Sequence, residues 1–284
     1  MRIALKQLSY LDIHFGIPLS AEILTAMKYV VLMLTLVCVV LSSGKPTLAS
    51  DQTKTLRRLH VPILMYHYVS ELPAGADATR RGLTVTPELF TAHMQYLHDQ
   101  GYTTISLYDL NDALTKGIKL PPKPIVLTFD DGYNDAYTNV FPVLKQFGFI
   151  GTFFIITSRP DANDPVYMSW SEIKEMSNAG MSMEPHTKDH VDLRQRDHDF
   201  LVYQMQGSIE SLAAYTGKTS HIFDYPVGHY DLATLHVAKE LDVWIAVSTA
   251  NGDTETTSNR LHLPRLRVSG NMSVDALASV LRHA

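Results

Sequence analysis

The feature that most restricts the fold is an alternation of strand and helix signals from Val61 to the C-terminus. Short apolar runs rich in branched residues indicate buried strands, and amphipathic segments lie between them. This order favours a largely parallel sheet, and about seven or eight such units favour closure into a barrel. The expected strands are Ile63–Tyr66, Thr103–Ser106, Ile125–Phe129, Thr152–Ile156, Met181–Met183, Ile222–Tyr225, Trp244–Val247 and Leu266–Val268.

The helices between these strands are indicated by residues that are typical of helix ends. Thr86 and Pro87 supply an N-cap and a first-turn proline for a helix that ends at Gly101. Pro142 should kink the helix expected between Asn134 and Phe147. Further helices are expected from the capping box Ser169-Trp170-Ser171-Glu172 onward, and over Asp197–Tyr215, Leu232–Leu241 and Ser273–His283.

The strand expected at Ile125–Phe129 ends in two adjacent carboxylates, Asp130 and Asp131, followed by Gly132. Neighbouring strand residues point to opposite sides of a sheet, so both carboxylates can serve one site only if the chain bends there. Gly132 is suited to such a bend. The alternative is a solvated Asp-Asp-Gly turn, which is common after strands.

A second polar stretch contains His186 and His190. Imidazoles at positions i and i+4 fit one face of a helical turn. Two imidazoles and a carboxylate can form a three-ligand metal site with open positions. Such ligands suit zinc or another divalent transition metal better than calcium or magnesium. The alternative for the two histidines is an ordinary polar turn.

The segments Thr128–Gly132 and His186–His190 resemble the first two motifs of the polysaccharide deacetylases, carbohydrate esterase family four. The similarity extends from Val61–His67, which contains Met-Tyr-His, to Leu263–Arg265, which reads Leu-Pro-Arg. It favours the branch of exported bacterial deacetylases that act on N-acetylglucosamine polymers. The resemblance implies an α/β fold, a distorted (β/α) barrel with about seven strands.

The resemblance also implies roles for the motif residues. Asp131, His186 and His190 would bind the metal, a divalent transition ion and most simply Zn²⁺. Asp130 would be the catalytic base that takes a proton from the attacking water. The metal, together with a backbone N–H from the loop after Pro226, would stabilise the oxyanion.

The third motif departs from the family at Asp224, where the family has an arginine that pairs with the catalytic aspartate. Like charges raise each other's pKa, so Asp224 should point away from Asp130, or an arginine from elsewhere should compensate. Arg265 is the candidate, because arginine can pair with a carboxylate through two hydrogen bonds. The alternative for Arg265 is a surface position before the last strand.

The general acid and the sugar-binding residues are less defined. The family's final Leu-x-His motif has its nearest match at His262, out of register by one, with His229 and His67 as rivals. His67 follows a strand and should face the same cleft, although a core position is the alternative. Tyr225 is the expected substrate-binding residue. Other aromatic residues that would either stack on sugars or lie in the core are Tyr66, Trp170 and Tyr230.

The domain organisation expected from the sequence has three parts. Residues 1–49 are an N-terminal extension and signal peptide, because Met27-Lys28 precedes an uncharged apolar run, Tyr29–Leu41, and small residues follow. The run is short for a membrane span, although a retained anchor is the alternative, and translation starting at Met27 or a non-native extension would explain residues 1–26. Residues 50–60 are a linker, and residues 61–284 form the deacetylase domain.

The sequence therefore predicts metal-dependent hydrolysis of N-acetyl groups from N-acetylglucosamine units of an extracellular or envelope polysaccharide. The alternatives are an O-acetyl esterase on xylan or another acetylated glycan, and a non-catalytic carbohydrate-binding relative. The net charge of −5 argues against nucleic acid as a partner. The signal peptide implies export, and Cys38, the single cysteine, would be removed with it.

Overall fold

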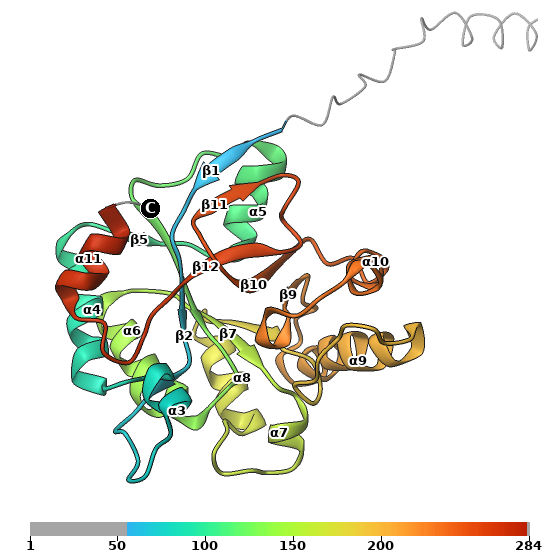
Figure 1. Ribbon diagram of the computed structural model, residues 1–284, viewed down its shortest axis with the longest axis horizontal. Helices are drawn as coiled ribbons and strands as arrows, with labels where there is room; N and C mark the ends of the chain where they lie inside the picture. The colour runs from blue at the N-terminus through green and yellow to red at the C-terminus, as the bar shows by residue number, and fades with distance from the viewer. Residues whose placement is uncertain (1–55, 283–284) are drawn as a thin grey trace, which may run out of the picture. The chain divides into compact units, whose positions relative to one another are not determined.

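The computed structural model describes residues 56–282, so the expectations for residues 1–49 lie outside the described residues. Its centre consists of seven strands, namely β2 (Ile63–Tyr66), β6 (Pro124–Phe129), β7 (Thr152–Ile155), β8 (Ser182–Pro185), β9 (Ile222–Asp224), β10 (Ile245–Asn251) and β12 (Leu263–Arg267). They form a parallel sheet in the order β8-β7-β6-β2-β12-β10-β9 (Figure 1). This nearly closed seven-stranded barrel confirms the predicted fold.

The barrel is not fully closed between its two end strands. Within residues 56–282, no backbone ladder joins β8 to β9. Side chains bridge the gap instead: His186 Nδ1 donates a hydrogen bond to the Asp224 carbonyl at 3.0 Å, and the Ser220 hydroxyl donates to Glu184. Buried polar contacts therefore hold this seam together.

Helices surround the barrel (Figure 1). The longer ones are α4 (Pro87–Asp99), α5 (Leu107–Lys116), α6 (Phe141–Phe147), α8 (Trp170–Asn178), α9 (His198–Thr216), α10 (Leu232–Glu240) and α11 (Val274–Arg282). Thr86 caps α4 by accepting a hydrogen bond from the Leu89 N–H, and Ser169 and Glu172 form the predicted capping box of α8. Where Pro142 was expected to kink a helix, a π-helical turn, η1 (Ala136–Val140), precedes α6.

The alternation of side chains along the strands divides the barrel interior into two halves. At one end the inward-facing positions are apolar and belong to a single buried cluster that includes Val126, Phe154, Ile222 and Leu263. Two residues further along β6, β9 and β12, the same face carries Thr128, Asp224 and Arg265, all buried. The polar half lies at the carboxyl ends of the strands, where active sites of such barrels are built.

Several short elements were not predicted. They are β3 (Tyr68–Val69), α3 (Ala78–Leu83), β4 (Thr84–Val85) and α7 (Ser158–Asp161). In Figure 1, α3 and α7 lie at the end of the barrel toward which the β2 arrow points. The strand expected at Thr103–Ser106 is shortened to β5 (Thr103–Thr104), because Ser106 is the N-cap of α5.

Of the linker expected at residues 50–60, the structure describes residues 56–60. Arg58–His60 form β1, which pairs antiparallel with β11 (Thr254–Thr256). The prediction is wrong for these three residues, because backbone pairing ties them to the barrel. Between residues 56 and 282, no helix has both the length and the apolar character that a membrane span requires.

Candidate active site and metal centre

A cavity of about 520 Å³ opens at the carboxyl ends of the barrel strands. Its wall brings together residues from several distant parts of the chain, among them His67, Arg80, Asp130, Asp131, His186 and His190. The predicted catalytic aspartate and all three predicted metal ligands therefore share one cavity.

The two adjacent aspartates reach this cavity because the chain turns directly after β6. Asp131 has a φ of 74° and Gly132 a φ of 77°, both in the left-handed region. Aspartate tolerates this conformation better than most residues, although at some cost. Asp130 and Asp131 consequently face the same site, and the bend predicted from their adjacency is confirmed.

Asp131, His186 and His190 form a compact group whose ligand atoms lie within 4.8 Å of one another. Asp131 Oδ1 is 3.5 Å from His186 Nε2 and 3.3 Å from His190 Nε2. Asp131 and His186 are buried, while His190 is partly exposed. This arrangement of one carboxylate and two imidazoles is consistent with the metal site expected for the family.

The two histidines do not lie on a helical turn, so that prediction is wrong. They follow β8 in a loop in which Thr187 and His190 have φ values of 62° and 56°. The loop stays beside the chain that follows β7, because the Thr157 N–H donates to the Thr187 carbonyl at 3.2 Å and the Ser158 N–H to the Lys188 carbonyl at 2.9 Å. Two left-handed residues, rather than a helix, bring the imidazoles together.

The surroundings of His186 prepare it to bind a cation. Burial alone would lower the pKa of His186, but the negative charges of Asp224, Asp131 and Asp130 outweigh burial and raise it to about 9. His186 Nδ1 is 3.0 Å from the Asp224 carbonyl and 3.2 Å from Asp224 Oδ2. These acceptors keep one proton on Nδ1, and a metal at Nε2, which faces Asp131, would take the place of the second proton that the negative surroundings favour. The site thus fits a divalent metal both in ligands and in charge.

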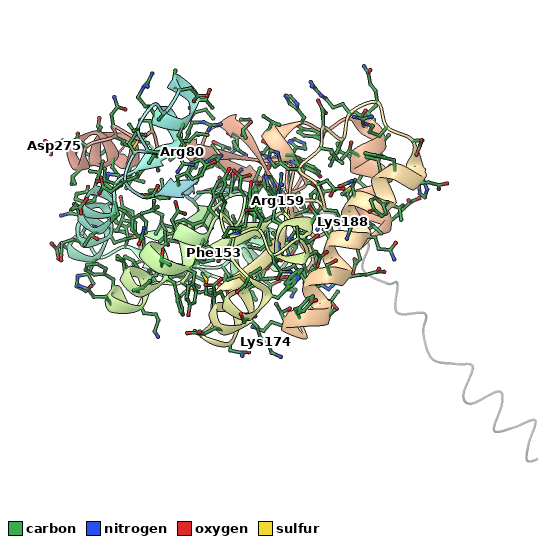
Figure 2. All side chains as sticks on the ribbon, turned by 90° about the horizontal axis from the view of Figure 1, so that it is seen from below. Arg80, Phe153, Arg159, Lys174, Lys188 and Asp275 are labelled. Carbon is green, nitrogen blue, oxygen red and sulfur yellow. The ribbon has the colours of Figure 1, made fainter. Side chains whose placement is uncertain are left out.

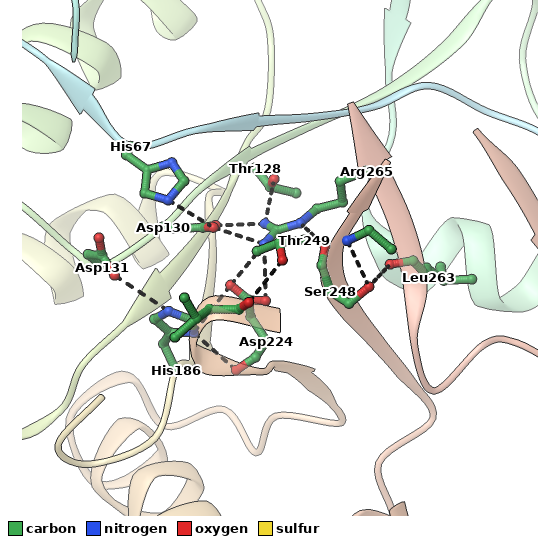
Figure 3. A network of polar contacts seen from close by, with 12 residues as sticks. His67, Thr128, Asp130, Asp131, His186, Asp224, Ser248, Thr249, Leu263 and Arg265 are labelled. Atoms are coloured by element: carbon green, nitrogen blue, oxygen red, sulfur yellow. Dashed lines mark hydrogen bonds and ion pairs between the residues drawn. The ribbon is translucent and has the colours of Figure 1, made fainter. Parts of the chain in front are cut away.

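Arg265 holds Asp130 through two hydrogen bonds (Figure 3). Nη1 donates to Oδ1 at 2.7 Å, and Nη2 donates to Oδ2 at 2.9 Å. Arg265 is completely buried and also donates to Thr128 Oγ1 and to the Ser248 carbonyl. Burial raises the pKa of Asp130, but the Arg265 charge and hydrogen bonds outweigh it, so that this pKa is lowered. The surface alternative for Arg265 is excluded, and its predicted pairing with Asp130 is confirmed.

Asp224 also contacts Arg265, so of the two expectations for Asp224 the structure shows the second, compensation by an arginine from elsewhere, and not a side chain that points away. Arg265 Nη2 is 3.1 Å and 3.2 Å from the two Asp224 carboxylate oxygens. Complete burial, helped by the nearby charge of Asp130, raises the pKa of Asp224 to about 7 although Arg265 opposes this. One guanidinium therefore lies between two carboxyl groups, which explains how an acid is accommodated where the family has an arginine.

Of the three histidines considered as the general acid, the structure brings only His67 to the cavity. His67 Nε2 lies 3.8 Å from Asp130 Oδ2. His229 contacts Asp192 Oδ2 at 3.0 Å, and His262 stacks on Tyr230 with ring centroids 5.4 Å apart. Burial lowers the pKa of His67, although the charges of Asp130 and Asp131 act in the opposite direction.

The aromatic residues of the site differ from those expected. The Tyr225 side chain has no exposed surface, and its hydroxyl donates to the Leu261 carbonyl at 2.9 Å. Its buried ring offers no face on which a sugar could stack, but Tyr225 borders the cavity, so its expected part in substrate binding stays a prediction. The cavity wall also includes Tyr68 and Tyr133, whose rings stack at 3.8 Å. Tyr68 directly follows His67 and Tyr133 directly follows Gly132, so their positions next to two motifs could have predicted from the sequence that they line the site.

The remaining aromatic candidates lie away from the cavity wall. Tyr66 is completely buried, and its hydroxyl lies 3.2 Å from His93 Nδ1. Trp170 stacks on Tyr215 with ring centroids 4.0 Å apart. None of these side chains lines the cavity that holds the metal ligands.

Comparison with known proteins agrees with the fold and the site. The family model described as polysaccharide deacetylase matches residues 117–246. A Bacillus subtilis protein named as a polysaccharide deacetylase, YxkH, is 32% identical over 228 residues, which cover 80% of this chain and 78% of that protein. The Staphylococcus aureus poly-β-1,6-N-acetyl-D-glucosamine N-deacetylase is 24% identical over 201 residues, 66% of this chain and 69% of that protein.

Solved structures give the same result. The Streptococcus pyogenes deacetylase PplD, in complex with acetate, superimposes with a TM-score of 0.74 and 30% identity, covering 79% of this chain and 99% of that chain. A Bacillus cereus polysaccharide deacetylase has a TM-score of 0.69 at 30% identity, covering 79% of this chain and 69% of that chain. The chain therefore belongs to the polysaccharide deacetylase family. It is a hydrolase with polysaccharide deacetylase activity.

Proposed function

We propose that the chain removes N-acetyl groups from N-acetylglucosamine units of an extracellular or envelope polysaccharide. The observation that carries this proposal is the position of Asp130, held by Arg265 directly beside the Asp131–His186–His190 cluster. The likeness to the S. aureus poly-β-1,6-N-acetyl-D-glucosamine N-deacetylase supports the choice of sugar.

Asp131, His186 and His190 would hold a divalent transition metal, and two imidazoles with one carboxylate make zinc the expected ion. When bound, such a cation polarises the acetyl carbonyl and lowers the pKa of water. Asp224 keeps the His186 ring in the required orientation, because both its carbonyl and its carboxylate face Nδ1.

Asp130 would act as the general base. Arg265 keeps it ionised at neutral pH and fixes the direction of both its oxygens. The attacking water gives its proton to Asp130 while its oxygen adds to the acetyl carbon. The carbon–nitrogen bond then breaks, and acetate and a free amine are formed.

His67 would return that proton to the leaving amine nitrogen. Its lowered pKa makes it mostly neutral in the free enzyme, so the proton it delivers is the one taken up by Asp130, whose Oδ2 lies 3.8 Å from His67 Nε2. Substitution His67→Gln should therefore lower turnover, and His262→Gln should not, because His262 stacks on Tyr230 and does not line the cavity.

The loop η2 (Pro226–Gly228) supplies the candidate oxyanion donor. The Gly228 and His229 N–H groups donate within the loop, at 2.7 Å to the Tyr225 carbonyl and 3.0 Å to the Pro226 carbonyl. Val227 lines the cavity, so its N–H is the donor of this loop that we assign to the developing oxyanion.

The test compares product release from two kinds of substrate by the purified protein. Release of both acetate and free amine from N-acetylglucosamine oligomers would support the proposal, and His186→Ala should abolish release and bound metal together. His262→Ala is the matched control and should retain both. Acetate release from acetylated xylan alone would favour the O-acetyl esterase, and saccharide binding without release would favour the non-catalytic alternative.

We further infer that the protein is exported. Residues 1–55 lie outside the described part of the chain, and the inference rests on the signal-like order of residues 27–49. Protein isolated from its host envelope should begin near Ser50. An N-terminus at Met1 or Met27 would contradict export with cleavage and would favour a retained membrane anchor.

A further inference from the structure

A stack of five side chains, here called the aromatic stack, begins at the cavity wall with Arg80, Tyr68 and Tyr133 and continues beyond it. The Arg80 guanidinium lies 3.1 Å from the centroid of the Tyr68 ring, and Tyr68 stacks on Tyr133 at 3.8 Å. Tyr133 stacks on Tyr167 at 5.0 Å, and the Arg159 guanidinium lies 5.0 Å from the Tyr167 ring. Figure 2 views the molecule from this end and shows Arg80 and Arg159 on the same face.

Arg80 has no acidic partner among the described residues. Its Nη2 donates to Ser70 Oγ at 3.3 Å, its Nε is buried without a hydrogen-bond partner, and its Nη1 has no acceptor within residues 56–282. Two acidic side chains of this region bind other groups: Asp77 caps α3 by accepting the Arg80 backbone N–H, and Asp135 accepts the Val69 N–H at 3.1 Å. The Arg80 charge acts on Asp135, where it opposes the effect of burial on the pKa of that carboxyl group, but no ion pair joins the two. The guanidinium is thus held in place by stacking and keeps donors available.

Arg267 is a second arginine on the cavity wall without an ion pair or hydrogen bond in the described part of the chain. It follows Arg265 by two positions on β12 and therefore extends from the same face of the strand, nearer its end. Arg265 is completely buried, whereas Arg267 is exposed. Arg267 pairs with Met65 in the ladder between β12 and β2, two residues before His67, so both residues lie on the same part of the cavity wall.

Two guanidinium groups without an ion pair in the described part of the chain therefore lie on one cavity wall, although the net charge of the protein is −5. Guanidinium is the side chain best suited to bind carboxylate or phosphate, because its N–H groups match two oxygens at once. Arg80 is already fixed against Tyr68, so little side-chain freedom would be lost on binding an anion. Asp77, which also lines the cavity, is engaged as the N-cap of α3.

We propose that Arg80 and Arg267 bind an anionic substituent, a carboxylate or a phosphate, on a sugar next to the N-acetylglucosamine unit that is deacetylated. The inference rests on the proposed function and makes it more specific. The substrate is an anionic glycan rather than a neutral homopolymer.

The experiment measures kcat and KM on three oligosaccharides of equal length that contain N-acetylglucosamine. One is neutral, one carries a carboxylate ether on alternate units, and one carries a phosphate monoester. Wild-type protein should prefer an anionic substrate by about tenfold in KM, which is the size expected for a charged hydrogen bond at a partly exposed site. The preference should shrink as salt concentration rises.

The variants Arg80→Gln and Arg267→Gln should each raise KM for the anionic substrate. The ratio of kcat/KM on the anionic substrate to kcat/KM on the neutral substrate should then fall toward one. Arg80→Lys should retain part of the preference, because it keeps the charge but loses the planar donors. Arg159→Gln is the matched control: it removes the arginine at the other end of the aromatic stack, which does not line the cavity, and should leave the preference intact. Thermal unfolding of each variant checks that the fold is retained.

Preference for only the carboxylate or only the phosphate substrate supports the proposal and identifies the anion. Equal activity of the wild type on neutral and anionic substrates overturns it while leaving the proposed function in place. An equal loss on all substrates in Arg80→Gln also overturns it, since that result indicates a structural role. Absence of amine release from every substrate overturns the proposed function itself.

Discussion

Both ends of the barrel contain buried carboxyl groups, but they differ in what surrounds those groups. At the carboxyl ends of the strands, Arg265 binds Asp130, and its charge lowers the pKa of that aspartate against the effect of burial. At the opposite end, Glu184 accepts hydrogen bonds from two serine hydroxyls, and Glu255 accepts the Val61 N–H at 2.9 Å. Burial raises the pKa of Glu184 to about 7 and that of Glu255 to about 8.

The comparison shows that burial alone does not make a carboxyl group functional. Glu184 lines a second cavity, of about 250 Å³. Its raised pKa, taken alone, would make it a candidate catalytic acid. No histidine lines that cavity, and Glu184 belongs to none of the metal-binding groups of the described residues. At one end a buried arginine and neighbouring imidazoles lower the pKa of Asp130 and Asp131 against the effect of burial. At the other end hydroxyl and amide donors also lower the pKa of Glu184 and Glu255, but burial outweighs them because no cation among the described residues is near enough to compensate.

The largest effect should come from removing the charged base. Asp130→Asn keeps the shape of the side chain but cannot take a proton, so turnover should fall by about 10²- to 10⁴-fold while metal content is unchanged. Asp131→Asn should lose metal first, and added metal should restore part of its activity. Assays at saturating metal, with metal analysis of both proteins, separate the two roles. Near wild-type turnover of Asp130→Asn would show that another residue is the base.

The next largest effect should come from removing the buried arginine, so that the carboxyl groups at the functional end lack a paired cation, as those at the opposite end do within residues 56–282. Arg265→Gln leaves Asp130 and Asp224 buried without their cation, which should lower the free energy of unfolding by about 3–5 kcal/mol and abolish most activity. Denaturant unfolding measures the loss. Arg267→Gln is the control on the same strand, and because Arg267 is exposed its stability should change by less than about 0.5 kcal/mol. Equal stability of both variants would contradict the importance assigned to Arg265.

A further effect, which depends on pH, is expected for Glu255 at the opposite end of the barrel. Its pKa is about 8 in the folded protein against an ordinary value of 4.5, so between these values the folded state binds more protons than the unfolded chain. The contribution of Glu255 to stability is complete below about pH 4.5 and is lost as pH rises toward 8, at up to about 1.4 kcal/mol per pH unit.

Glu255→Gln removes this titration and should flatten the pH dependence of unfolding between pH 5 and 8, as measured by denaturant titrations over that range. Glu88→Gln, on the first turn of α4 at the surface, is a matched control. An unchanged slope in Glu255→Gln would mean that the carboxyl group is already ionised in the folded protein.

The barrel and the metal ligands could be predicted from the sequence because their signals are local. A buried strand run ending in Asp130 and Asp131, and the short segment from His186 to His190, each carry their information within a few residues. The partner of Asp130 is not local: Arg265 is 135 positions away, and only the pairing of strands through β2 brings them together.

Other features depend on packing that no short pattern reveals. The i,i+4 spacing of His186 and His190 is compatible with a helix, but hydrogen bonds to the chain after β7 determine the loop instead. Tyr225 is an aromatic residue of the kind that stacks on sugars. Its ring is buried because it belongs to the hydrophobic cluster between β9 and the helices beside it. The helix α3, which supplies Arg80, is too short to show the hydrophobic periodicity that predicts a helix from the sequence.

The seam between β8 and β9 has a consequence for motion. Strands in the middle of the sheet, such as β2 and β6, are held by backbone ladders on both sides, whereas β8 and β9 have a ladder on one side only within the described residues. Local opening should therefore require less free energy at this joint than elsewhere in the ring. Amide hydrogen exchange should be faster along β8 and β9 than along β2 and β6. Because His186 contributes to both the joint and the metal cluster, occupancy of the cluster should slow exchange on both sides of the gap.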